Sequence, residues 1–303
     1  MISQSLKNAQ PRGRVKLTHN SVLQIAMRWL GRIVVALFAV GIVIFVLLPF
    51  YWMAKSSFQT NTEIIAIPPT WIPQSLTLEG YQRALTMIPF VRYLTNSMVI
   101  ATATTVLSAL LASSAAYVIA RYPFPGATAI LAIFLFTQLI PPITRVFPVY
   151  FLIKDLNLIN TYPGATIAYI SFSLPYAVLM LSGYFRNSYP VELEDAALID
   201  GCTLFSVFWR IVLPISLPGI IAIATFTFLG AWNDFLWASL LLYQGQMKTL
   251  QVGLRDFIGE FGSFQRANAF MAACVMSTIP ALVLFSLGQK NMVQGISAGA
   301  VKG

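Results

Sequence analysis

Few side chains in this sequence could take part in chemistry, and they are scattered. The chain has one histidine, His19, in a polar N-terminal stretch, and two cysteines, Cys202 and Cys274, which lie far apart. The cysteines form no CxxC pair, so we interpret them as small packing residues rather than as a disulfide or metal site. No GxxxxGK[ST] phosphate-binding loop occurs. We therefore predict that the chain is not an enzyme, with no catalytic residue, no metal and no cofactor of its own.

A single acidic residue, Asp234, lies inside a long apolar run. A charge at the centre of a bilayer costs about 2.5–3.5 kcal/mol on insertion scales, so such a residue usually faces a partner or water. With its neighbours Trp232, Asn233 and Trp237, it could contact a solute in a transport pathway. The alternative is a hydrogen bond between helices, and we favour this structural interpretation.

The composition indicates a membrane protein. Of 303 residues, 57% are hydrophobic and only 10% are charged, whereas soluble domains carry about 25% charged residues. The net charge is +9, but the basic residues do not gather on one stripe with interleaved aromatics, so we predict no nucleic-acid binding. In membrane proteins such an excess more often marks cytoplasmic segments.

Six apolar runs approach or reach the length of about 20 residues that spans a bilayer. They are Ile33–Ala54, Ser97–Ala120, Ala127–Pro142, Pro163–Phe185, Leu217–Leu242 and Ala269–Leu287. Helices are expected because backbone groups in lipid must bond within their own segment, and no alternating ten-residue strands of a β-barrel are visible. The first run exceeds a signal-peptide core and lacks a cleavage site. We predict an all-α polytopic membrane protein with about six transmembrane helices.

These runs also predict the organisation of the chain. A basic N-terminal tail (1–32) precedes the first transmembrane helix (33–54), an extracytoplasmic loop (55–96), a core of five further helices (97–288) and a C-terminal tail (289–303). With both termini cytoplasmic, inside segments hold 11 Lys and Arg residues and outside segments hold 8, which favours this orientation. Short outside helices are expected over Leu78–Leu85 and within Ile143–Tyr162.

The segment between the fourth and fifth runs, residues 186–216, predicts a short helix, a bend and a second short helix. The start signals of the first helix are Ser188, Pro190 and then the acids Glu192, Glu194 and Asp195. Gly201 can end this helix and Thr203 can cap the next one. Aromatic side chains follow at Phe205, Phe208 and Trp209. The pattern fits either a solvated amphipathic loop or a surface bound by another protein.

The sequence DAALIDGCTLFSVFWRIVLP resembles the EAA loop of ABC importer permeases, in which Glu-Ala-Ala, three residues, Gly, nine residues and Ile-x-Leu-Pro follow one another. The matching positions are Asp195, Ala196, Ala197, Gly201, Ile211, Leu213 and Pro214. Asp195 stands where the pattern usually has Glu, and Glu194 precedes it. The resemblance implies a type I ABC importer permease fold, whose cytoplasmic EAA loop binds an ATPase subunit and transmits its motion.

Further stretches resemble the maltose-transporter-type carbohydrate permeases, specifically the shorter of their two membrane subunits. These are PPTWIPQSLTLEGYQRAL, LNLINTYPG, GAWNDFLWASLLL and VQGISAGAVKG. The resemblance implies import of a sugar or oligosaccharide across a bacterial or archaeal cytoplasmic membrane. The implied partners are a second homologous permease subunit, two cytoplasmic ATPase subunits that bind ATP and Mg, and an extracytoplasmic solute-binding protein.

Two alternatives stay open. A permease of this kind could carry a non-sugar solute such as a polyol or glycerol phosphate. Less favoured is a self-contained secondary transporter, because such proteins usually carry buried ion-coupling acids and inverted repeats. Here Asp234 is the one acid in an apolar run, and no repeat is detectable.

Overall fold

The computed structural model describes the backbone of residues 19–258 and 266–300, and the side chains of 27–258 and 266–292. Within these ranges the chain forms helices and connecting segments, without a β-strand. The chain divides into two units, residues 1–52 and residues 53–303. The all-α prediction is confirmed for the described part of the chain.

The first unit consists, as far as it is described, of most of α1 (His19–Ser57). The part from Met27 to Ser57 is 31 residues long and apolar enough to cross a membrane. The predicted first transmembrane helix, residues 33–54, lies within it. Apolar side chains occur on all faces of this stretch, as expected for a helix surrounded by lipid.

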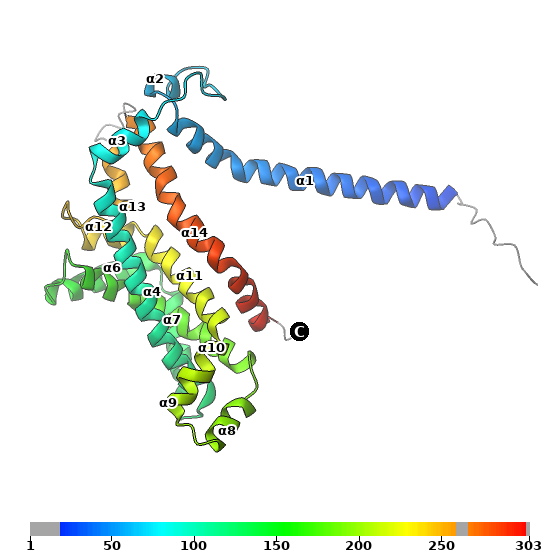
Figure 1. The fold of residues 1–303 in the computed structure, drawn as a ribbon, viewed down its shortest axis with the longest axis vertical. Helices are drawn as coiled ribbons and strands as arrows, with labels where there is room; N and C mark the ends of the chain where they lie inside the picture. Colours follow the sequence, from blue (N-terminus) through cyan, green and yellow to red (C-terminus); the bar gives the residue numbers. More distant parts are fainter. Residues whose placement is uncertain (1–18, 259–265, 301–303) are drawn as a thin grey trace, which may run out of the picture. The chain divides into compact units, whose positions relative to one another are not determined.

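The second unit holds the remaining helices. In chain order they are α2 (Asn61–Ile64), α3 (Glu79–Met87), α4 (Phe90–Arg121), α5 (Ala127–Leu139), α6 (Pro142–Asp155), α7 (Tyr162–Asn187), α8 (Glu192–Ile199), α9 (Leu204–Val207), a π-helix (Phe208–Val212), α10 (Leu213–Ile215), α11 (Leu217–Asn233), α12 (Leu236–Leu241), α13 (Leu250–Leu254), a 3-10 turn (Arg255–Phe257) and α14 (Ala267–Ala300). Within this unit α4, α11 and α14 run lengthwise, with α3 near one end and α8 and α9 at the other (Figure 1). The predicted short helix at Leu78–Leu85 is confirmed as α3.

Four helices are long and apolar enough to span a membrane: Met27–Ser57, Phe90–Arg121, Tyr162–Asn187 and Ala267–Met292. Two further spans are possible if each of two bent helix pairs crosses the membrane as one unit. These pairs are α5 with α6, bent by 106°, and Leu204–Ile215 with α11, bent by 75°. The prediction of about six transmembrane helices agrees with this count.

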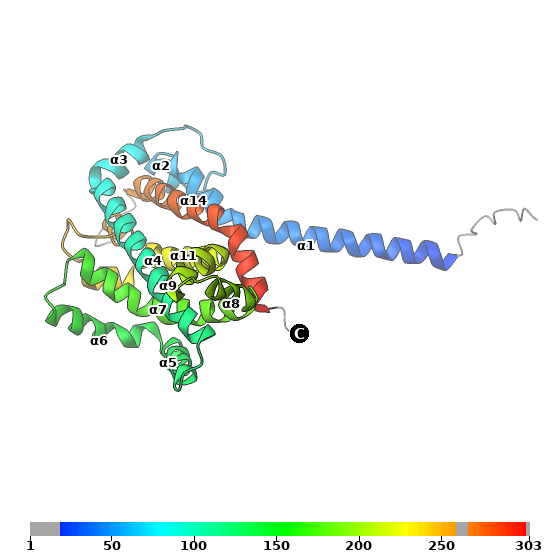
Figure 2. The same cartoon turned by 60° about the horizontal axis from the view of Figure 1, so that its bottom comes forward.

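Two predicted runs differ from the observed helices. The third run ends earlier than predicted, at Leu139, because Pro141 and Pro142 follow and a new helix starts at Pro142. Figure 2 shows α5 turning away from this helix, α6. α6 confirms the short helix predicted within Ile143–Tyr162. The fifth run was predicted as one helix to Leu242, which is wrong: the backbone is extended at Asp234 and resumes as α12.

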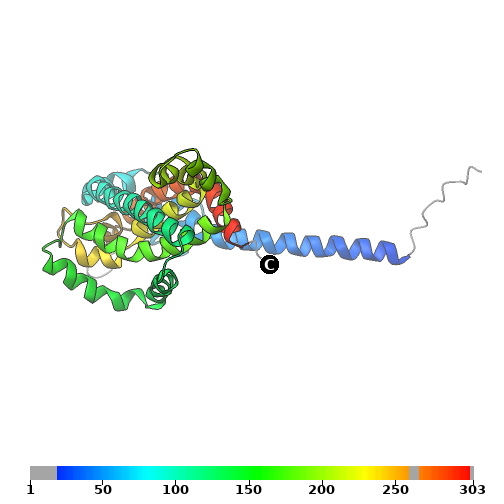
Figure 3. The same ribbon diagram turned by 90° about the horizontal axis from the view of Figure 1, so that it is seen from below.

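The central packing unit is the pair α4 and α7, which lie side by side (Figure 3). Small buried residues such as Ala112, Ala116 and Ala177 let the two backbones approach. The hydroxyls of Ser108 and Ser173 are hydrogen-bonded across them at 2.7 Å, a contact that contributes about 0.6 kcal/mol on average inside membranes. Two candidate functional sites lie along this pair, one at its α8 end and one near its middle.

Candidate functional site

The EAA segment, residues 192–214, folds as the predicted helix–bend–helix. Gly201 has φ +85° and follows the end of α8. The N–H of Gly201 donates to the carbonyl of Leu198, and the N–H of Cys202 donates to that of Ala197, which is a Schellman C-cap. The hydroxyl of Thr203 accepts from the N–H of Ser206 and caps α9. The predicted roles of Gly201 and Thr203 in the backbone are therefore confirmed.

One other local prediction for this segment needs correction. Ser188 ends α7 rather than starting α8, which begins at Glu192 after a turn. The predicted aromatic face is confirmed, because the rings of Phe205 and Phe208 lie 5.9 Å and 5.6 Å from that of Trp209. Phe208 turns inward, 5.1 Å from the ring of Tyr117, whereas Phe205 and Trp209 stay exposed.

Residues of the EAA pattern fall into two groups by exposure. Asp195, Ala196, Gly201 and Pro214 are exposed, Ile211 and Leu213 are half-buried, and Ala197 and Glu194 are buried. Around the bend, apolar side chains point outward: Ile199 is 86% exposed, Phe205 74% and Leu204 51%. Contiguous exposed apolar side chains mark interaction sites on proteins. The bend thus presents an apolar surface beside the exposed acid Asp195.

The buried Glu194 fixes α8 to the end of α4. Its Oε2 accepts a 2.6 Å hydrogen bond from the hydroxyl of Tyr117. Its Oε1 lies 2.9 Å from Nε of Arg121; the two attract as opposite charges, although the angle between them is not that of a hydrogen bond. Both side chains are almost completely buried. Glu194 therefore has its partners within this chain, and of these two adjacent acids Asp195 is the one that faces outward.

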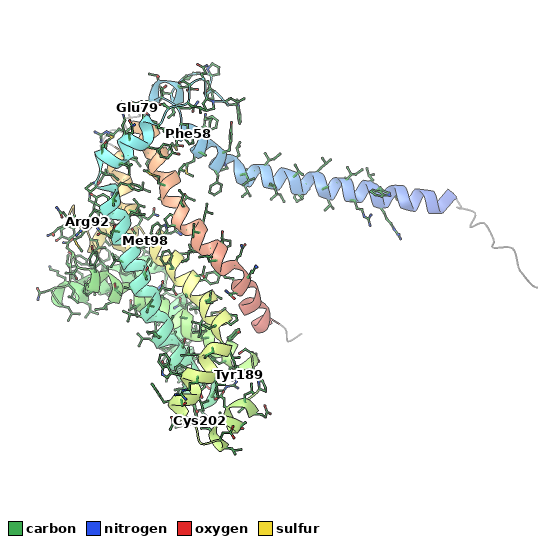
Figure 4. All side chains as sticks on the ribbon, in the orientation of Figure 1. Phe58, Glu79, Arg92, Met98, Tyr189 and Cys202 are labelled. Atoms are coloured by element: carbon green, nitrogen blue, oxygen red, sulfur yellow. The ribbon has the colours of Figure 1, made fainter. Side chains whose placement is uncertain are left out.

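Tyr189 completes this group, which we call the Glu194 anchor (Glu194, Arg121, Tyr117 and Tyr189). Arg121 donates from Nη2 to the carbonyl of Tyr189 at 3.0 Å, and its guanidinium carbon lies 4.3 Å from the Tyr189 ring centre. Burial raises the pKa of Tyr189 to about 12. Figure 4 labels Tyr189 and Cys202 at this end of the second unit, and Phe58 and Glu79 at the opposite end.

A second candidate site is a cavity of about 370 Å³ lined by α4–α7, α11 and α12. Its aromatic lining comprises Tyr169, Phe172, Tyr176, Phe226 and Trp237. Two charged side chains, Arg145 from α6 and Asp234 from the break after α11, also line it. This volume lies at the small end of ligand pockets, which hold about 300–1,000 Å³ and combine apolar walls with a few polar groups.

The structure separates the four residues predicted around Asp234. Asp234 and Trp237 line the cavity. Trp232 is buried elsewhere and stacks on Phe228, with ring centres 5.8 Å apart. Asn233 is exposed and does not line this cavity.

Asp234 both lines the cavity and forms a hydrogen bond to a neighbouring helix, the two environments considered from the sequence. Its Oδ2 accepts from the hydroxyl of Tyr169 on α7 at 2.8 Å and from the N–H of Ala238 at 2.9 Å. The first bond ties the break after α11 to α7, and the second satisfies a backbone N–H in the first turn of α12. These contacts show how the sequence tolerates an irregular backbone here, since it borders a cavity rather than lipid. Whether Asp234 also contacts a solute stays a prediction.

Sequence reasoning missed Arg145 and the aromatic residues from α7. The missed signal is a basic residue three positions after the Pro141–Pro142 pair, where a new helix starts. Arg145 stacks over Phe172, with its guanidinium carbon 5.1 Å from the ring centre. Phe172 in turn lies 4.2 Å from Trp237.

The family model and the individual relatives that match this chain are all components of transport systems. Residues 108–298 match the family described as "Binding-protein-dependent transport system inner membrane component". The chain is 32% identical over 273 residues to the diacetylchitobiose uptake system permease protein DasC of Streptomyces coelicolor, covering 90% of this chain and 98% of that protein. It is 34% identical over 276 residues to the trehalose/maltose transport system permease protein MalG of Thermococcus litoralis, with the same coverage.

A third relative is the sulfoquinovosyl glycerol transport system permease protein SmoH of Agrobacterium fabrum, which is 33% identical over 257 residues (85% of this chain, 89% of that protein). The fold is similar to that in the crystal structure of a bacterial ABC transporter involved in the import of the acidic polysaccharide alginate. The TM-score is 0.77 at 21% identity, and the match covers 88% of this chain and 97% of that chain. This last likeness bears on the fold alone.

Proposed function

We propose, because this chain belongs to the family of binding-protein-dependent transport system inner membrane components, that it is one membrane subunit of an ATP-driven importer of sugars. Relatives named for the uptake of diacetylchitobiose and of trehalose/maltose support the sugar assignment, since each covers 90% of the chain at 32–34% identity. In this proposal the chain forms half of the translocation pathway with a second, homologous permease subunit.

The observation that carries the proposal is the surface around the Gly201 bend. Here a rigid turn at φ +85° is flanked by the exposed apolar side chains of Ile199, Leu204 and Phe205. We infer that this surface, with Asp195, binds a cytoplasmic ATPase subunit, and that the Glu194 anchor passes the movement of that subunit to α4. Two ATPase subunits bind ATP and Mg, and this chain supplies no nucleotide site.

Binding of a cytoplasmic ATPase at the Gly201 bend also implies an orientation of the second unit in the membrane. The end with α8 and α9 faces the cytoplasm, and the α3 end faces outside, where a solute-binding protein docks. Support comes from the position of these elements at opposite ends (Figure 1). A cysteine-free background (Cys202→Ser, Cys274→Ser) allows a direct test with a membrane-impermeant thiol reagent. Cysteine at the exposed Ser75 should be labelled from outside and cysteine at Asp200 should not; the opposite pattern would reverse the orientation.

The decisive experiment changes the bend and measures the ATPase. Gly201→Val strains the left-handed turn by about 1–2 kcal/mol, although a Cβ there meets nothing within 4 Å among the described residues beyond its chain neighbours. Asp195→Lys reverses the exposed charge. Matched controls are Gly126→Val, at another left-handed glycine of the described residues with equally open space (φ +101°), and Asp155→Lys, at an exposed acid on α6.

We expect both EAA variants to insert normally but to lose co-purification of the ATPase, or to hydrolyse ATP without transport. Both controls should keep ATPase association and binding-protein-stimulated hydrolysis in liposomes. Normal association and normal stimulated turnover in both EAA variants would contradict the coupling role. Equal losses in the controls would assign the effect to general damage.

A further inference from the structure

Arg145 is a cation that the described part of the chain leaves without an anionic partner. Its Nε is buried and has no hydrogen-bond acceptor, and none of the ion pairs among the described residues includes it. A buried hydrogen-bond donor without an acceptor costs about 1–3 kcal/mol, and more when it is charged. Because such a group lowers the stability of the fold, we look for a functional role that accounts for Arg145.

Asp234 lines the same cavity but does not neutralise Arg145. Its Oδ2 already accepts from Tyr169 and from the backbone of Ala238. These bonds hold it against α7 and the start of α12. Arg145 instead lies over the ring of Phe172, so its guanidinium is positioned by an aromatic face and not by an acid. The cation is therefore held in place by an aromatic face, and its buried Nε has no acceptor among the described residues.

The remaining lining suits a sugar ring. Phe172 and Trp237 have ring centres 4.2 Å apart, and Tyr176 and Phe226 form an edge contact at 6.3 Å. Such aromatic walls offer apolar faces for the C–H groups of a ring. The polar lining residues Thr104, Gln138, Ser173 and Thr227 offer hydroxyl and amide groups for sugar hydroxyls.

We propose that this cavity binds an acidic sugar and that Arg145 pairs with its carboxylate. The planar guanidinium matches a carboxylate with two parallel hydrogen bonds, a geometry that a neutral sugar hydroxyl cannot reproduce. The cavity volume of about 370 Å³ limits the site to a short segment of the sugar at a time. This inference rests on the proposed function, whose substrate class it narrows to sugars that contain a uronic acid unit.

Binding to the permease–ATPase complex in nanodiscs tests the inference without the selectivity of a solute-binding protein. The probes are digalacturonate and its neutral counterpart galactobiose, measured by calorimetry. A carboxylate paired with Arg145 should favour digalacturonate by about tenfold to a hundredfold. Glucose 6-phosphate serves as a further arm, because a preference for phosphate over carboxylate would overturn the assignment to uronic acids.

The variants are Arg145→Gln, which removes the charge, and Arg145→Lys, which keeps the charge but loses the planar pair of donors. We expect Arg145→Gln to abolish the preference and Arg145→Lys to reduce it. Arg92→Gln is the matched control, since Arg92 is exposed and lies outside the cavity lining; it should keep the preference.

Equal binding of the two disaccharides, or a preference that survives Arg145→Gln, would overturn the inference. Loss of the second permease subunit from Arg145→Gln would also overturn it, because Arg145 would then pair with that subunit. In each of these cases a complex that still imports the sugar retained by its binding protein leaves the importer assignment standing. Failure of the chain to associate with any ATPase would instead overturn the proposed function, and this inference with it.

Discussion

Two groups of charged side chains lie near the α4–α7 pair, one almost completely buried and one half-buried, and their partners differ. At the α8 end, Glu194 and Arg121 are 2.9 Å apart and Tyr117 donates a second bond to the carboxylate. In the cavity, Arg145 and Asp234 line the same space without forming an ion pair. The first group joins two elements of the chain, and the second leaves a cation directed at an aromatic ring.

This difference separates structural charges from functional ones. Removing one member of a buried pair leaves an uncompensated charge and costs about 3–5 kcal/mol. Replacing Arg145, which has no anionic partner among the described residues, should cost little, because only its contact with the Phe172 ring is lost. Stability measurements can therefore distinguish the two groups without knowledge of the transported solute.

The largest expected effect belongs to Glu194→Ala. It leaves Arg121 buried without its acid, so we expect the free energy of unfolding to fall by about 3–5 kcal/mol. Thermal unfolding of the purified subunit in detergent should detect this loss. Glu192→Ala, at an exposed position of the same helix, should change stability by about 0.5 kcal/mol or less. A similar small change in Glu194→Ala would show that the anchor does not hold α8.

A double-mutant cycle sharpens the same comparison. Glu194→Gln and Arg121→Gln each leave one buried charge, whereas the double variant leaves none. We expect the double variant to be more stable than the sum of the single losses predicts, by about 1–3 kcal/mol. Strict additivity in thermal unfolding would mean that the two side chains do not interact, despite their 2.9 Å separation.

The EAA segment could be predicted from sequence to a large extent because its signals are local. A glycine that adopts φ +85° and a threonine that caps the next helix act through their immediate neighbours. The burial of Glu194 could not be predicted in the same way. It depends on Tyr117 and Arg121, which lie more than 70 positions earlier in the chain, and nothing local distinguishes Glu194 from the exposed Asp195.

An intermediate loss in the free energy of unfolding is expected when Asp234 is replaced. Asp234→Ala removes the acceptor of two hydrogen bonds, one to Tyr169 and one to a backbone N–H in the first turn of α12. Tyr169→Phe removes only the first. Because hydrogen bonds to charged groups contribute about 1.5–3 kcal/mol each, we expect Asp234→Ala to lose about 3 kcal/mol and Tyr169→Phe about half as much. Equal losses in thermal unfolding would indicate that the bond to α12 contributes nothing.

The cavity was predicted only in part, for a physical reason. Apolar composition predicts helices in lipid, but it does not show where a helix breaks when a side chain replaces backbone hydrogen bonds. The carboxylate of Asp234 does this for the N–H of Ala238, so the predicted fifth helix stops at Asn233. Beyond the break Trp237 lies against Phe172, whereas Trp232 packs in another cluster. A sequence window around Asp234 contains all of these residues without indicating where the helix breaks.

The smallest expected effect on stability, and the most informative one, belongs to Arg145→Met. Methionine keeps an unbranched apolar stem for the contact with Phe172 but removes the charge and its unsatisfied donor. We expect the free energy of unfolding to stay the same or to rise by about 1 kcal/mol, as is common when a group kept for function is replaced. Arg121→Met, the matched change at the paired arginine, should destabilise by about 3–5 kcal/mol. If the two variants lost stability equally in thermal unfolding, Arg145 would have a structural partner, and the distinction between the two groups of charges would fail.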